Sequence, residues 1–243
     1  MAILFVGLDH LAALRTAGAA RDPDPVIAAT LAELAGAGGI SITLGRERTG
    51  MQERDLRLLR ETARTPLNVC LPPQEEWVKL ALGVRPDLVT LVPETREGLG
   101  AERGLDVEDR RAELARILEM LRSAGIPTSA TVEAAPGQVK AAHRAGTTGV
   151  LLHTGRFSWA DNAAARAMEL DRLVNAAKIG HRLGLAVHAG GGFGLETLGE
   201  IAPIPEIGAV HVGHAFVARA VLVGIGEAVR DLSRVLSRAG GLT

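Results

Sequence analysis

Two segments near the end of the chain combine glycine and histidine at a spacing typical of ligand-binding turns. The first reads HAGGGFG over residues 188–194, and the second reads HVGHAFVARAV over residues 211–221. Each passes from glycine into a helical pattern, and the free N–H groups at the start of a helix can bind an anion. Glycine, which has no side chain, lets the backbone approach a ligand closely. Two such segments favour a phosphate site over simple tight turns.

Three histidines, His153, His188 and His211, each lie in a short apolar run. Three neutral imidazoles with an open position could hold zinc or another divalent transition metal, with Glu133 as a further ligand. His153 or His188 could also serve as a catalytic general base, because imidazole titrates near neutral pH. A third interpretation is that these histidines only hydrogen-bond to backbone carbonyl groups.

Cys70 is the single cysteine of the chain and closes another apolar run. It could be a catalytic nucleophile if a nearby cation or histidine lowered its pKa, or it could be a small buried apolar residue. Arg46 and Arg48 follow an apolar run and could clamp a second phosphate or a carboxylate, or remain solvated. Trp159 could wall a pocket against a flat ligand or pack against another subunit. Arg15 fits helix packing, a dimer salt bridge or ligand binding.

Short apolar runs alternate along the chain with longer stretches of helical period, which predicts repeated strand–helix units and a parallel sheet. Eight such units in 243 residues predict one closed (β/α)8 TIM barrel, in a single domain over residues 1–243. In this fold the chemistry lies at the carboxyl ends of the strands, where the polar residues named above are found. The expected strands are 3–8, 39–44, 66–71, 88–93, 127–133, 149–154, 185–190 and 208–213.

Bulk composition excludes several classes of protein. The chain is 47% hydrophobic with a formal net charge of −1, so nothing in it attracts nucleic acid or an anionic membrane. A single cysteine excludes an internal disulfide and suits a reducing compartment. The first ten residues lack the basic region of a signal peptide. We therefore expect a cytoplasmic protein.

Several segments together resemble the pyridoxine 5′-phosphate synthase family, which closes the ring of vitamin B6. The similarity runs from about residue 3 to residue 235, and it is carried by VGLDHLAALR, DPDPVIAA, LVPETREGLGAERGLD, LHTG, HAGGGF and VGHAFVARAV. The resemblance implies a TIM barrel that assembles as an octamer of dimers and needs no cofactor. It also implies condensation of 1-deoxy-D-xylulose 5-phosphate with 3-amino-2-oxopropyl phosphate, releasing phosphate and water. By position, the resemblance assigns substrate binding to Asp9, His10, Gly192, Gly213 and His214.

The acid–base residues of that family are replaced in this chain. By the same resemblance, Thr43 stands in place of a histidine base, Cys70 in place of a glutamate base and Gly191 in place of a histidine acid, while Leu151 replaces another acidic residue. A positioned acid or base contributes about 10²- to 10⁴-fold to a rate. We therefore expect the family reaction to be slow here unless other groups have taken over.

Three functional classes follow from these patterns. The first, which we favour, is an enzyme related to the synthase that acts on small phosphorylated substrates. The second is an enzyme with another reaction that uses His153, His188 and His211, with or without a metal. The third is a non-catalytic protein that binds a phosphate ester. We expect a small phosphorylated substrate and inorganic phosphate as ligands, and self-association in the range from dimer to octamer.

Overall fold

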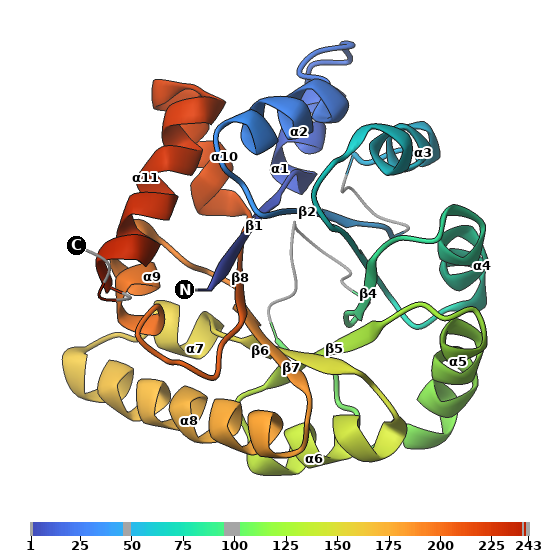
Figure 1. Cartoon of the computed structure of the whole chain (residues 1–243), viewed down its shortest axis with the longest axis vertical. Coiled ribbons are helices and arrows are strands. Elements are labelled where there is room, and N and C mark those ends of the chain that lie inside the picture. Colours follow the sequence, from blue (N-terminus) through green and yellow to red (C-terminus); the bar gives the residue numbers. More distant parts are fainter. Residues whose placement is uncertain (1, 46–49, 95–102, 240, 242–243) are drawn as a thin grey trace.

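The computed structural model describes residues 2–45, 50–94, 103–239 and 241. Its eight parallel strands close into a barrel in which each strand pairs with its neighbours in sequence order, and β8 pairs with β1. The predicted (β/α)8 barrel is thus confirmed, with helices around the ring of strands (Figure 1). The strands are β1 (Ile3–Gly7), β2 (Gly39–Thr43), β3 (Leu67–Leu71), β4 (Leu88–Leu91), β5 (Thr128–Glu133), β6 (Gly149–His153), β7 (Ala186–Gly190) and β8 (Ala209–Val212).

The helices begin and end at residues that favour those positions. Asp24 caps the second helix by accepting a hydrogen bond from the Val26 N–H, and Pro25 occupies its first position.

No helix within the described ranges is long and apolar enough to cross a membrane. The helices are α1 (Asp9–Ala17), α2 (Pro25–Leu34), α3 (Glu53–Thr62), α4 (Glu75–Val84), α5 (Arg111–Ser123), α6 (Pro136–Ala145), α7 (Gly155–Ser158), α8 (Ala163–Arg182), α9 (Leu195–Ile201), α10 (His214–Val223) and α11 (Ile225–Ala239).

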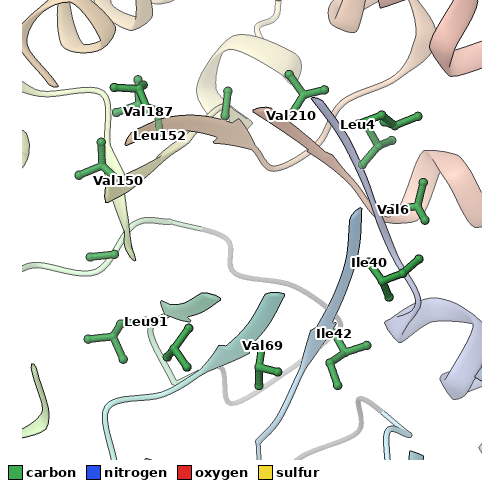
Figure 2. Close-up of a cluster of buried hydrophobic side chains, with 14 of the residues drawn as sticks. Leu4, Val6, Ile40, Ile42, Val69, Leu91, Val150, Leu152, Val187 and Val210 are labelled. Carbon is green, nitrogen blue, oxygen red and sulfur yellow. The ribbon is translucent and has the colours of Figure 1, made fainter. Parts of the chain in front are cut away.

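The hydrophobic core lies between the strands and the surrounding helices. Val, Ile and Leu side chains point outward from the ring of strands, among them Leu4, Val6, Ile40 and Val69 (Figure 2). Successive residues of a strand face opposite sides, so every second residue faces this layer. Burying one such side chain contributes roughly 1.5–3 kcal/mol. This layer stabilises the barrel and leaves its interior to the alternate residues.

On β2 to β5 the interior of the barrel is lined by small polar side chains instead of the usual bulky branched ones. Thr90 Oγ1 donates to Asn68 Oδ1 at 2.7 Å, and Asn68 Nδ2 donates to Ser41 Oγ at 2.9 Å. The hydroxyl oxygens of Ser129 and Thr131 are buried and bond to nothing within the described part of the chain. Small side chains do not fill a barrel of this size, so space remains for a ligand.

A buried ion pair holds the segment that follows β2. Arg15 on α1 donates to Asp55 on α3 through both terminal nitrogens, at 3.0 and 2.6 Å, and also to the Gly50 carbonyl at 2.8 Å. Asp55 is fully buried and also accepts from the Gln52 N–H. Of the interpretations offered for Arg15, the structure favours helix packing, because its partners belong to the same chain.

Candidate active site

A cavity of about 410 Å³ opens at the carboxyl ends of the strands. Its volume lies in the range of small-molecule sites, and its position is the usual one for chemistry in this fold. The strand ends and the turns that follow them supply its walls: Gly7, Asp9, His10, Ser41, Thr43, Cys70, Val92, Thr131, Leu151, His153, Trp159, Gly190, Gly191, Gly192, Phe193, His211, Val212, Gly213 and His214. The cavity brings both opening segments of the sequence together.

The turn after β7 presents unpaired backbone N–H groups. Gly191 and Gly192 have φ angles of +107° and +76°, which only glycine adopts readily. Their N–H groups donate no hydrogen bond to any described residue. The Gly191 carbonyl is held by Thr154 Oγ1 and, at 3.4 Å, by Ser158 Oγ. Thr154 and Ser158, which follow β6, therefore hold this turn at the cavity wall.

Two imidazoles and the turn after β8 lie on another part of the same wall. Gly213 is the N-cap of α10, and its N–H makes no hydrogen bond within the described ranges. The rings of His10 and His214 meet edge to face with centroids 5.0 Å apart. Burial, and then the nearby His214, lower the pKa of His10. Both rings and the free N–H groups line one cavity, so they can bind a single anion.

Asp9 is a carboxyl group of the cavity whose pKa is raised toward neutral pH. Its carboxylate accepts hydrogen bonds from the Thr43 N–H at 2.6 Å and from Thr43 Oγ1 at 2.9 Å. Burial raises its pKa to about 6 against these two hydrogen bonds, which lower it. A carboxyl group that titrates near the working pH can both accept and return a proton. The resemblance assigned Asp9 to substrate binding, and its pKa suits it to proton transfer as well.

The stability of the variant Asp9→Asn relative to the unmodified protein is expected to rise by about 3 kcal/mol as pH increases from below 4 to above 6. The folded state keeps the Asp9 proton up to about pH 6, whereas the unfolded chain loses it near 3.8. The stability that Asp9 contributes is therefore present below pH 4 and lost as pH rises to 6. Urea unfolding of both proteins from pH 4 to 7.5 measures this difference. A difference in free energy of unfolding that stays constant over that range would contradict the raised pKa.

Cys70 lines the cavity as a protonated thiol. Burial and the nearby Asp9 raise its pKa to about 11, against weak hydrogen bonds from Ser41 and Asn68. Among the described residues no cation offsets this effect, and a thiol that stays protonated is a poor nucleophile. The geometry thus favours the interpretation of Cys70 as a small buried residue.

His188 and His211 form a hydrogen-bonded pair inside the barrel. His188 Nδ1 and His211 Nε2 are 3.1 Å apart, and the Phe5 ring stacks on His211 with centroids 4.6 Å apart. Burial lowers the pKa of His188 to about 4, and burial with the neighbouring His188 lowers that of His211 well below its ordinary value. Both rings are neutral at physiological pH, so one N–H group is shared between them.

The predicted three-histidine metal site does not form among the described residues. Strand register places His153 and His211 level with each other on either side of Gly190, and His188 lies two residues deeper in the barrel. The stagger of neighbouring strands therefore keeps the three imidazoles from lying at one depth. No group of three His, Cys, Asp or Glu side chains that could hold a metal ion occurs in the described part of the chain.

His153 and Glu133 lie at the ends of neighbouring strands and face different surroundings. His153 lines the central cavity, with its Nδ1 3.9 Å from Glu133 Oε1. Glu133, also a candidate catalytic residue from the sequence, accepts the Gly104 N–H at 2.8 Å and pairs with Arg156 at 3.2 Å, on the wall of a second cavity of about 400 Å³. His153 therefore remains a candidate catalytic group, whereas Glu133 holds the segment that returns from β4.

The other predicted residues divide into two groups. Thr43, Leu151 and Gly191, the positions without family acids or bases, all line the central cavity. Arg46 and Arg48 lie outside the described residues. Sequence reasoning missed the bonds between Asp9 and Thr43 and the polar interior around Asn68. The polar residue Asn68 within the apolar run 66–71 was the available signal for that interior.

Comparison with known proteins shows the family to which this chain belongs. Residues 4–238 match the family described as "Pyridoxal phosphate biosynthesis protein PdxJ". The chain belongs to this family. It is 45% identical over 236 residues to the pyridoxine 5′-phosphate synthase of Synechococcus sp. (strain JA-2-3B′a(2-13)), a match that covers 97% of this chain and 99% of the relative. Its identity to the synthase of Syntrophotalea carbinolica is also 45%, over 98% of this chain and all of the relative.

Solved structures agree with the fold of the PdxJ-family chain. N-(5′-phosphoribosyl)anthranilate isomerase from Pyrococcus furiosus superposes with a TM-score of 0.61 at 10% identity, over 98% of this chain and all of the isomerase. At that identity the likeness concerns the barrel alone. The relatives at 45% identity make this an enzyme of the synthase family by descent.

Proposed function

We propose that this protein is a phosphate-ester enzyme of the synthase family in which ring closure is slow. Its substrates are small phosphorylated molecules, and the reaction it inherits is the condensation of 1-deoxy-D-xylulose 5-phosphate with 3-amino-2-oxopropyl phosphate. One observation carries the proposal: the free N–H groups of Gly191, Gly192 and Gly213 and the rings of His10 and His214 line one cavity.

Phosphate binding at this wall follows from the chemistry of its groups. Unpaired N–H groups at glycine turns bind phosphate oxygens without a competing side chain. His10 and His214 add ring N–H donors, and a phosphate dianion stabilises the protonated form of His10. Desolvation alone disfavours a charged His10, so a bound phosphate and a proton on His10 favour each other.

Proton transfer would fall to the titratable groups that still line the cavity. Asp9, with a pKa of about 6, can take a proton from a substrate carbon or nitrogen and return it at a later step. His153, at the end of β6, adds an imidazole to the same cavity. Thr43, Leu151 and Gly191 cannot titrate near neutral pH, so several proton transfers lack a dedicated group. We therefore expect turnover to be slower than in a synthase with all its acids and bases by about 10² or more.

Assembly and location complete the proposal. Large apolar side chains are exposed at the end of α10 and along α2, including Val221 at 69%, Leu222 at 77% and Leu34 at 80%. Exposed apolar clusters of this kind favour contacts between copies of one chain. We place the protein in the cytoplasm as a homo-oligomer.

The decisive experiment incubates the purified protein with both family substrates and measures pyridoxine 5′-phosphate by mass spectrometry. We expect slow product formation whose rate rises as Asp9 loses its proton near pH 6. Turnover equal to that of a full synthase would contradict the proposed loss of acid–base groups. No product, together with no thermal stabilisation by phosphate esters, would overturn the whole proposal. Stabilisation without product would identify a protein that binds the ester and does other work.

A double variant, His10→Ala with His214→Ala, tests the phosphate wall directly. Loss of two donors to a charged ligand is expected to weaken binding of glycerol 3-phosphate about tenfold or more, measured by isothermal titration calorimetry. His181→Ala is the matched control, because His181 is exposed on α8. Equal affinity in all three proteins would contradict a role for these rings in binding phosphate.

A further inference from the structure

Trp159 is an exposed indole fixed at the rim of the central cavity. It follows α7, lines the cavity and is 60% exposed, unusual for so large an apolar side chain. Only two tryptophans occur in the chain, and the other, Trp77, is on α4 across the barrel from α7 (Figure 1). A large apolar ring that is this exposed is expected to be covered by a ligand or by another protein surface.

Two glycines border the ring on opposite sides. A Cβ atom built on Gly192 would come within 2.8 Å of Trp159 Cε2, and one built on Gly155 would come within 2.7 Å of Cζ3. These two ring atoms are on opposite edges of the six-membered ring, so a glycine lies against each edge. The Trp159 N–H also donates to the Gly155 carbonyl at 2.9 Å through the backbone. The ring is therefore confined between two backbone segments, which reduces the entropic cost of a contact with it.

The same contact ties the ring to the phosphate wall. Gly192 is one of the residues with a free N–H group facing the proposed phosphate, and it lies directly against the indole. A ligand whose phosphate binds at Gly192 therefore has its next few atoms beside Trp159. The imidazole of His153 also borders this place and meets the indole edge to face, with ring centroids 6.3 Å apart.

We propose that Trp159 is a specificity residue that stacks on a flat, conjugated ring carried within a few bonds of the phosphate. This inference rests on the proposed phosphate site and adds one specificity residue to it, for the planar heterocycle with a phosphate monoester that the family reaction forms. Offset stacking between two rings adds attraction beyond the area they bury. The ligand, and not a second subunit, then covers the exposed indole.

The test compares a ligand with the ring and a ligand without it. Pyridoxine 5′-phosphate carries a flat ring one methylene group from its phosphate, and glycerol 3-phosphate has a phosphate and no ring. Trp159→Leu is expected to weaken binding of pyridoxine 5′-phosphate about three- to tenfold and to leave glycerol 3-phosphate within twofold. Trp159→Phe, which keeps an aromatic ring, is expected to restore most of the affinity. Calorimetry gives both dissociation constants.

Fluorescence supplies a second readout that a structural role would not move. In a Trp77→Phe background, pyridoxine 5′-phosphate is expected to quench the remaining indole, and glycerol 3-phosphate is not. Equal loss of both ligands in Trp159→Leu would overturn the stacking role and make Trp159 a support for the glycine turn. Unchanged binding of both would overturn it as well. If the unmodified protein bound neither ester, both the phosphate site and the stacking proposal would be wrong. If it bound both esters and Trp159→Leu changed neither affinity, only the stacking proposal would be wrong.

Discussion

Replacing Asp55 by alanine is expected to lower the free energy of unfolding by about 3–5 kcal/mol. Asp55 is fully buried and accepts two hydrogen bonds from Arg15, which is itself 6% exposed. Without the carboxylate, the guanidinium is a buried charge whose remaining partner is the Gly50 carbonyl. Removing one member of a buried ion pair costs far more than the pair contributes, because the other charge stays unpaired. Urea unfolding at pH 7 measures the change.

Two controls separate the buried charge from simple loss of packing. Arg15→Met combined with Asp55→Leu removes both charges and is expected to recover much of the lost stability. Glu53→Ala breaks the exposed pair with Arg57 on the same helix and is expected to cost less than about 0.5 kcal/mol. If the single Asp55→Ala variant were no less stable than the double variant, the buried ion pair would not be what holds α1 to α3.

The pH dependence of this pair has a definite sign. Burial alone would raise the pKa of Asp55, but hydrogen bonds from Arg15 and the Gln52 N–H outweigh it, and the pKa is lowered. The stability that Asp55 contributes is then present above its ordinary pKa and lost as pH falls below it. Asp9 acts in the opposite direction, since its raised pKa makes the fold less stable as pH rises to 6.

The strands could be predicted from the sequence because their outward faces carry the signal. The apolar run 149–154 became β6 (Gly149–His153), and the run 185–190 became β7 (Ala186–Gly190). Parallel strands covered by helices need apolar residues at these positions, so each run marks a strand without reference to its neighbours. The glycine turns after β7 and β8 followed from the same reading, because glycines placed after a strand indicate where a ligand can approach.

Relations between strands could not be predicted in the same way. The depth of His188 relative to His153 depends on the stagger between β6 and β7, which is a property of the closed barrel and not of either run. The bond between Arg15 and Asp55 joins residues 40 apart, and neither has a neighbour in sequence that indicates the other. The pKa of Asp9 likewise depends on burial within the assembled barrel, which a single run cannot show.

Returning a carboxylate to position 70 is expected to raise product formation by about 10²-fold or more. By the resemblance of the sequence, Cys70 stands where the synthase family has a glutamate base. The thiol is buried at the cavity wall, with Asn68 Nδ2 at 3.4 Å and Ser41 Oγ at 3.7 Å from its sulfur. These two groups can donate to a carboxylate, and the cavity of about 410 Å³ has room for the larger side chain.

The substitution Cys70→Glu is preferable to restoring the histidine at position 191. A side chain at Gly191 would need a φ of +107°, and its Cβ would lie 2.9 Å from the ring of His153. Gly191→His would therefore strain the backbone and displace a candidate catalytic group. Thr43→His is a suitable second step, because the Thr43 N–H that binds Asp9 belongs to the backbone and survives the change.

Cys70→Gln is the matched control for Cys70→Glu, since glutamine has nearly the same shape and cannot take a proton. If proton transfer limits the reaction, Cys70→Glu forms pyridoxine 5′-phosphate faster than Cys70→Gln, and its rate rises with pH as the new carboxyl group ionises. Asp9 lies close enough to Cys70 to raise the pKa of that thiol, so two carboxyl groups here would titrate as a coupled pair. The rise should therefore extend above the pKa of an isolated glutamate. Equal rates in the two variants, with equal affinity for glycerol 3-phosphate, would mean that the missing base does not limit turnover and that the barrel has changed its reaction.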